Sequence, residues 1–195
     1  MTEPQVMIAR VALLAVLGIG VATADPVQPK KLREQAAKST RHSATPKPGI
    51  RPAKLINLYN GWTHEWLALG PGKQPSQPML DRFLRDHYTN SPGAMEPRLP
   101  DILVAAANHF DRETVIVVSG FRHPKYNLLL RKKGHQVARD SHHTHGNAVD
   151  FKLPGVATKD LHAWAKQRKI GGVGLYATSG FIHMDTGPVR YWEGE

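Results

Sequence analysis

A histidine-rich loop followed by a single carboxylate is the part of the sequence best suited to chemistry. The segment SHHTHGNAVDFKL, residues 141–153, turns at Gly146 into an expected strand that contains Asp150. Side chains alternate between the two faces of a strand, so the apolar neighbours of Asp150 face the core, and Asp150 shares the other face with the small Ala148. His143, on the far side of the glycine turn, could reach the same point as Asp150.

A second segment, FIHMD at residues 181–185, offers a further ligand. By the same alternation, His183 and Asp185 share one face while Ile182 and Met184 are buried on the other. Two histidines and one carboxylate with an open fourth position are the ligand set of a catalytic zinc site. The spacing alone is only moderately specific, because a lone loop histidine is usually a polar surface residue.

Composition limits which metal sites and partners are possible. The chain has 195 residues, 26 Lys and Arg against 16 Asp and Glu, and no cysteine. Without cysteine, any metal must bind to His, Asp or Glu. Residues 25–54 hold eight basic and two acidic residues, net +6, whereas residues 55–195 hold 17 and 13, net +4. A nucleic-acid-binding domain carries its charge on the folded surface and shows a known motif, so we expect no nucleic-acid partner.

The N-terminal region has the pattern of an export signal followed by a linker. Arg10 precedes the apolar run 11–24, which is too short for a comfortable membrane span and ends in the small residues Ala-Thr-Ala. We expect residues 1–24 to be a signal peptide cleaved after Ala24, the alternative being an uncleaved membrane anchor. Residues 25–54, rich in Pro, Lys and Arg, are expected to form a flexible basic linker, and residues 55–195 to form the folded domain.

The folded part mixes strands and helices. Asn60-Gly61 within residues 55–69 predicts a β-hairpin, and helices are expected at residues 79–87, 100–110, 124–133 and 158–168. Further strands are expected at residues 114–119, 147–153, 170–176, 181–185 and 189–192. Short connections between the late strands favour an α+β domain with a mostly antiparallel sheet flanked by helices.

Three ordered motifs carry a resemblance to a known family. The pattern S-x-H-x-x-G-x-A-x-D is met by Ser141, His143, Gly146, Ala148 and Asp150. Upstream, S-G-[YF]-R-x-P-x-x-N-x-x-L-R is met by Ser119, Gly120, Phe121, Arg122, Pro124, Asn127, Leu130 and Arg131. Downstream, G-G-V-G-x-Y and F-x-H-x-D-T-G-x-x-R-x-W are met by residues 171–176 and 181–192. From Leu55 to Trp192 the chain resembles the LAS metallopeptidases, which include D-Ala-D-Ala carboxypeptidases and dipeptidases, and among them the murein endopeptidase K branch.

The resemblance implies a hedgehog/D-Ala-D-Ala peptidase-like fold and assigns roles to individual residues. His143, Asp150 and His183 would bind Zn²⁺, which lowers the pKa of a bound water and polarises the scissile carbonyl. Arg122 would stabilise the oxyanion or a substrate carboxylate, unless it is only a solvated arginine or pairs with a nearby aspartate.

The general base is where the sequence departs from the family. Several relatives place Glu or His shortly before the last zinc histidine, but residues 180–182 here are Gly, Phe and Ile. Asp185 could take the proton or, equally, orient a zinc-bound imidazole, and His145 is a weaker candidate for the base.

The resemblance implies an exported zinc peptidase that acts on peptidoglycan stem peptides in the periplasm or cell envelope. The first hypothesis is an endopeptidase that cuts cross-links. In this hypothesis the basic linker contacts anionic envelope polymers. The alternatives are a D-alanyl carboxypeptidase or dipeptidase, and a zinc-stabilised wall-binding module without turnover. A zincin protease is disfavoured because no H-E-x-x-H motif occurs.

Overall fold

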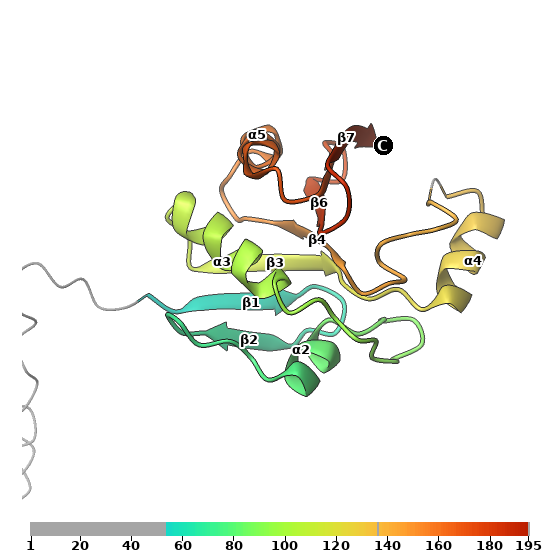
Figure 1. Cartoon of the computed structure of the whole chain (residues 1–195), viewed down its shortest axis with the longest axis horizontal. Coiled ribbons are helices and arrows are strands. Elements are labelled where there is room, and N and C mark those ends of the chain that lie inside the picture. Colours follow the sequence, from blue (N-terminus) through green and yellow to red (C-terminus); the bar gives the residue numbers. More distant parts are fainter. Residues whose placement is uncertain (1–53, 136, 195) are drawn as a thin grey trace, which may run out of the picture. The chain divides into compact units, whose positions relative to one another are not determined.

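Seven strands form one mixed sheet in the computed structural model, which describes residues 54–135 and 137–194. The strand order is β2-β1-β3-β4-β6-β5-β7, and the strands labelled in Figure 1 follow it from β2 at the bottom to β7 at the top. The expected signal peptide and, apart from Lys54, the expected linker lie outside the described residues. Among the described residues, no helix has the length and apolar character needed to cross a membrane.

The expected elements are present, with shifts of a few residues at their ends. The strands are β1 (Ile56–Asn60), β2 (Trp66–Leu69), β3 (Thr114–Ser119), β4 (Ala148–Lys152), β5 (Gly172–Tyr176), β6 (Phe181–Asp185) and β7 (Arg190–Gly194). The helices are α2 (Gln77–Phe83), α3 (Leu99–His109), α4 (Pro124–Lys132) and α5 (Thr158–Arg168). The first helix is shorter than the apolar repeat predicts, because the chain turns after Leu84 and the buried Asp86 accepts backbone hydrogen bonds in the following loop.

The prediction of a mostly antiparallel sheet is wrong, although the α+β class is confirmed. β1 pairs with β3 in parallel, and β5 pairs with β7 in parallel. In the first parallel pair, the chain leaves β2, passes through α2 and α3 and enters β3 on the far side of β1, where β3 runs opposite to β2 and therefore parallel to β1. The second arises because residues 186–189 carry the chain around the start of β5, so that β7 adds to the sheet beyond it.

Packing of the core determines which faces of β4 and β6 carry Asp150 and His183. α3 packs on β3, α5 packs on β5 and β6, and the two helices also contact each other. Val149 and Phe151 of β4 belong to the apolar core, as do Ile182 and Met184 of β6. The predicted alternation in both strands is therefore confirmed, and burial of these four side chains turns Asp150 and His183 to the opposite face.

Close backbone approach at the start of β5 requires a residue without a side chain. A Cβ on Gly171 would overlap the carbonyl oxygen of Asp185, at the end of β6. Backbone atoms in a sheet cannot move aside as the end of a flexible side chain can, so Gly171, directly before β5, allows β6 to lie where it does.

We expect Gly171→Ala to destabilise the fold by about 1–3 kcal/mol, the usual cost of overpacking a rigid site. Gly70→Ala is the matched control, since a Cβ there would make only ordinary contacts with Lys73 and Leu55. Thermal unfolding followed by circular dichroism measures both, and an unchanged melting temperature for Gly171→Ala would contradict the packing argument.

Candidate metal centre

Strand register brings two of the three candidate ligands face to face. β4 and β6 are antiparallel neighbours in which Asp150 pairs with His183 and Ala148 pairs with Asp185. Directly opposite residues have Cβ atoms about 5 Å apart, which suits side chains that share a ligand. The core-facing residues of both strands place the carboxylate and the imidazole on the same face of the sheet. The register then places them directly opposite each other.

The third candidate ligand, His143, comes from the loop before β4. Its Nδ1 lies 2.7 Å from the carbonyl oxygen of Gly120, and its own carbonyl accepts a hydrogen bond from the backbone of Arg122. The turn to β4 is made at Gly146, whose φ of +74° favours glycine and whose missing Cβ leaves room for the carbonyl oxygen of Ala94. The loop is thus fixed on both sides, and the ring of His143 points at Asp150.

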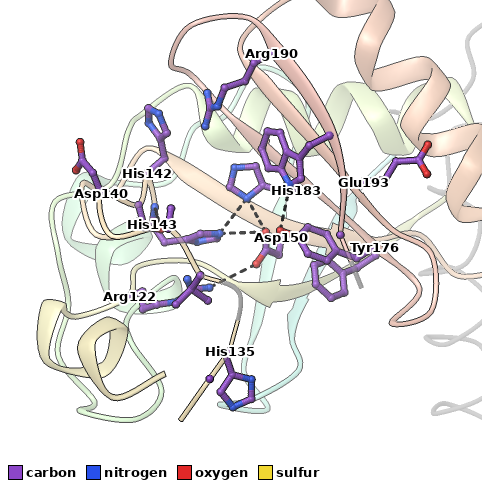
Figure 2. Close-up of a pocket in the computed structure, with 17 residues that line it drawn as sticks. Arg122, His135, Asp140, His142, His143, Asp150, Tyr176, His183, Arg190 and Glu193 are labelled. Atoms are coloured by element: carbon purple, nitrogen blue, oxygen red, sulfur yellow. Dashed lines mark hydrogen bonds and ion pairs between the residues drawn. The ribbon is translucent and has the colours of Figure 1, made fainter. Parts of the chain in front are cut away.

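The three side chains converge on one point (Figure 2). His143 Nε2 lies 3.1 Å from both Asp150 Oδ1 and His183 Nδ1, and His183 Nδ1 lies 2.8 Å from Asp150 Oδ1. Ligand atoms about 2.0–2.2 Å from a tetrahedral zinc ion lie about 3.3–3.5 Å from one another, so only small movements would admit the ion. All three residues are at least 94% buried.

The tautomers of both imidazoles suit a metal site. The outer nitrogen of each ring faces an acceptor, Gly120 O for His143 and Asp185 Oδ2 for His183, the latter at 2.9 Å. A proton held on each outer nitrogen leaves the inner nitrogen with its lone pair directed at the common point. The residues present therefore fit a divalent cation that takes nitrogen and oxygen ligands, such as Zn²⁺.

The electrostatics of the site favour positive charge at that point. Burial alone would raise the pKa of Asp150, but the two imidazoles outweigh it and hold that pKa far below its usual range. Burial also opposes a charge on His183, yet hydrogen bonds with Asp150 and Asp185 raise its pKa. Burial lowers the pKa of His143, which keeps that ring neutral. A neutral imidazole and an ionised carboxylate are the forms that bind metals.

Asp185 lies behind His183, not in front of it. It is completely buried, and its oxygens accept hydrogen bonds from the backbone N–H groups of Gly172 and Gly187, both at 2.9 Å. The guanidinium of Arg190 donates to both oxygens, at 2.7 and 3.2 Å. With every direction occupied, the carboxylate is suited to orient the imidazole of His183.

Glycines in β5 let the edge strand β7 reach this part of the site. Gly172 lies between Asp185 and Arg190 in the sheet, and a Cβ on Gly172 would overlap both side chains. Likewise Gly174 lies between His183 and Trp192, and its missing Cβ allows the indole to lie 5.1 Å from the imidazole, centroid to centroid. The G-G-V-G motif therefore holds the supporting side chains of β7 against β6.

A pocket of about 660 Å³ opens in front of the three ligands. Arg122 lines it and lies on the same side as His143, while Tyr176 lies on the opposite side (Figure 2). Arg122 Nη2 is 3.9 Å from Asp150 Oδ2, which makes the predicted alternative of an ion pair real but longer than a hydrogen bond. Its guanidinium faces both the cluster and the pocket.

The structure separates the other sequence candidates. His145 pairs with the exposed Asp140 at 2.6 Å and is not among the residues that line the pocket. His142 does line it, with Nδ1 3.0 Å from Asn147 Oδ1. Sequence reasoning gave no role in the site to Arg190 or Trp192, although the alternation of β7 places both on one face and would have indicated that they act together.

A family model and several known proteins match most of this chain. The family model described as peptidoglycan L,D-endopeptidase MepK matches residues 51–192. The chain belongs to this family. It is 35% identical over 154 residues to the Haemophilus influenzae protein named "Probable peptidoglycan L,D-endopeptidase MepK", covering 77% of this chain and 82% of that protein. It is also 35% identical over 152 residues to peptidoglycan L,D-endopeptidase MepK of Escherichia coli K12, covering 76% and 82%.

No solved structure matches the chain. The family match confirms the resemblance inferred from the sequence motifs, and with it the prediction of a metallopeptidase. It also spans every residue of the cluster described above.

We expect Asp185→Asn to weaken zinc binding about 10- to 100-fold, because the amide keeps the shape but loses the charge that holds the proton on His183 Nε2. The measurement is a competition titration against a chromophoric chelator. Asp160→Asn, at an exposed position in the first turn of α5, is the control and should bind zinc as the unaltered protein does. Unchanged affinity in Asp185→Asn would show that this carboxylate does not support the metal site.

Proposed function

We propose that this chain is a zinc-dependent peptidoglycan endopeptidase that hydrolyses cross-links between stem peptides. The observation that carries the proposal is the convergence of His143, Asp150 and His183, within hydrogen-bond distance of one another at the base of an open pocket. The relatives named as L,D-endopeptidases support the bond class and the substrate.

His143, Asp150 and His183 would hold the zinc ion through Nε2, Oδ1 and Nδ1 respectively. When bound, zinc supplies a water of lowered pKa and polarises the carbonyl of the scissile bond. The chain supplies the shape of the site: the Gly120 carbonyl fixes the ring of His143, and Asp185 fixes the ring of His183. Side chains locked in this way need no rearrangement when substrate binds.

Asp185 acts here as a positioning residue and not as the general base. Its oxygens are occupied by His183, two backbone N–H groups and Arg190, and it does not line the pocket. His145 also lies outside the pocket lining. Neither is therefore placed to take a proton from a water that reaches the substrate.

Arg122 serves the substrate side of the cluster. Its side chain is 13% exposed and points into the pocket beside Asp150. A guanidinium has five N–H donors and a fixed charge, so it can stabilise the negative charge that develops on a carbonyl oxygen or bind a carboxylate of the stem peptide. The pairing with Asp150 holds this charge in place.

Because peptidoglycan lies outside the cytoplasmic membrane, the same proposal includes export of the chain to the periplasm or cell envelope. The basic residues of segment 25–54 would then lie near anionic envelope polymers.

Digestion of purified peptidoglycan tests the function. We expect dimeric fragments to be converted to monomers, chelation to abolish this activity, and stoichiometric zinc to restore it, as followed by liquid chromatography and mass spectrometry. Release of free D-alanine would instead indicate a carboxypeptidase. Retention on peptidoglycan without any soluble product would indicate a binding module.

We expect Arg122→Lys to lower kcat/KM by about 10²–10³-fold, as removal of one oxyanion donor does, because lysine keeps the charge but loses the planar pair of donors. Metal content and melting temperature should stay unchanged, since Arg122 is not a ligand. Unaltered turnover in this variant would remove Arg122 from the reaction.

A further inference from the structure

Four aromatic rings form an exposed patch beside Arg122, which we call the ring patch: Trp62, His87, Tyr88 and Tyr126. Trp62 belongs to the turn between β1 and β2, His87 and Tyr88 to the loop after α2, and Tyr126 to the first turn of α4. The ends of β1 and β3 and the start of α4 lie at the same end of the sheet (Figure 1). Three segments distant in sequence thus contribute rings to one surface.

The rings are held by one another in two stacks. Trp62 and His87 are parallel within 6° with centroids 4.3 Å apart, and Tyr88 and Tyr126 are parallel within 11° at 4.8 Å. The stacks meet where His87 and Tyr126 touch edge to face, at 5.1 Å. Trp62 is 57% exposed and Tyr88 is 60% exposed. Since a neighbouring ring covers one face of each, their exposure falls on the outer faces and edges.

One buried carboxylate forms hydrogen bonds both with the loop of the ring patch and with the segment that carries Arg122. Asp86, only 1% exposed, accepts hydrogen bonds from the backbone of Tyr88 and Thr89 through Oδ1 and from that of His123 through Oδ2, all at 2.7 Å. His123 directly follows Arg122, which lines the pocket of the metal centre. The loop that carries His87 and Tyr88 is therefore hydrogen-bonded to the residue next to Arg122.

The composition of the ring patch differs from that of the apolar hollow beside β2. It consists of four rings, and Thr63 and Thr89 directly follow Trp62 and Tyr88 in the sequence. The apolar hollow beside β2, in contrast, contains the aliphatic side chains of Leu67 and Met79 next to Trp66. Flat aromatic faces with polar edges match pyranose rings, which have C–H groups on their faces and hydroxyl and amide groups at their rims.

The surroundings of His87 and Tyr126 favour the uncharged forms of these two side chains, which suits a neutral ligand. Burial lowers the pKa of His87, Asp86 opposes this, and Arg122 adds to it. Burial likewise raises the pKa of Tyr126, although Arg122 opposes it. The influence of Arg122 on both groups agrees with its position next to the ring patch.

We propose that the ring patch binds the glycan strand of peptidoglycan by stacking of its N-acetylated sugars on Trp62 and Tyr88, while an attached stem peptide enters the pocket beside Arg122. This inference rests on the proposed function, because the peptide and the glycan are two parts of the same polymer. Preordered rings lose little conformational freedom on binding, so a small patch suffices to hold a polymer near the metal centre.

A binding experiment tests the ring patch without any hydrolysis. The probe is a soluble oligomer of four β-1,4-linked N-acetylglucosamine units, titrated into the full chain by calorimetry and NMR, with and without a metal chelator. We expect saturable binding that is unaffected by the chelator and weakened roughly two- to tenfold in both Trp62→Ala and Tyr88→Ala. Trp66→Ala is the matched control: it removes a tryptophan of the same hairpin that is 63% exposed but lies outside the stacks.

An activity experiment separates this proposal from the function it extends. We expect Trp62→Ala to raise KM severalfold on glycan-linked peptidoglycan and to leave hydrolysis of a sugar-free cross-linked peptide dimer unchanged. An equal loss on both substrates, or no change on either, would overturn the role of the ring patch while leaving the peptidase intact. If the unaltered protein cleaves neither substrate, the proposed function fails, and absence of oligosaccharide binding independently overturns the ring patch.

Discussion

Three electron-pair donors held about 3 Å apart inside a protein repel one another unless a proton or a cation lies between them. This condition governs the region around His143, Asp150 and His183, all of them almost completely buried. The protein holds them together with a sheet register, a glycine turn and outer hydrogen bonds that fix both imidazole rings. Much of the remaining architecture can be understood as support for that arrangement.

Successive hydrogen bonds hold the imidazole of His183 in place. Asp185 fixes His183, and Arg190 with two backbone N–H groups fixes Asp185. Gly172 and Gly174 make this possible, because they let side chains of β7 pass over β5 and reach β6. A carboxylate with this many hydrogen-bond partners is suited to fix the imidazole of His183, as proposed above. The proposed reaction therefore requires a proton acceptor among the groups that face the pocket.

A buried carboxylate that accepts several hydrogen bonds also fixes the chain on the other side of Arg122. Asp86 is a second buried carboxylate whose oxygens are filled by backbone donors, and it joins the loop after α2 to the segment that carries Arg122. The proposed peptide-binding and sugar-binding surfaces are thus connected through rigid contacts, with no long linker between them. Such a connection suits an enzyme whose substrate is a polymer with two chemically different parts.

The sequence by itself determined the elements, the inward faces of β4 and β6 and the three residues that could bind a metal, because alternation along a strand and residue chemistry are local properties. Only the tertiary structure decided that β1 and β3 are parallel, that Asp185 lies behind His183, and that Trp62, His87 and Tyr126 touch. These facts depend on which strands become neighbours and on where loops return. Both are set by packing between segments far apart in the chain, to which no local pattern is sensitive.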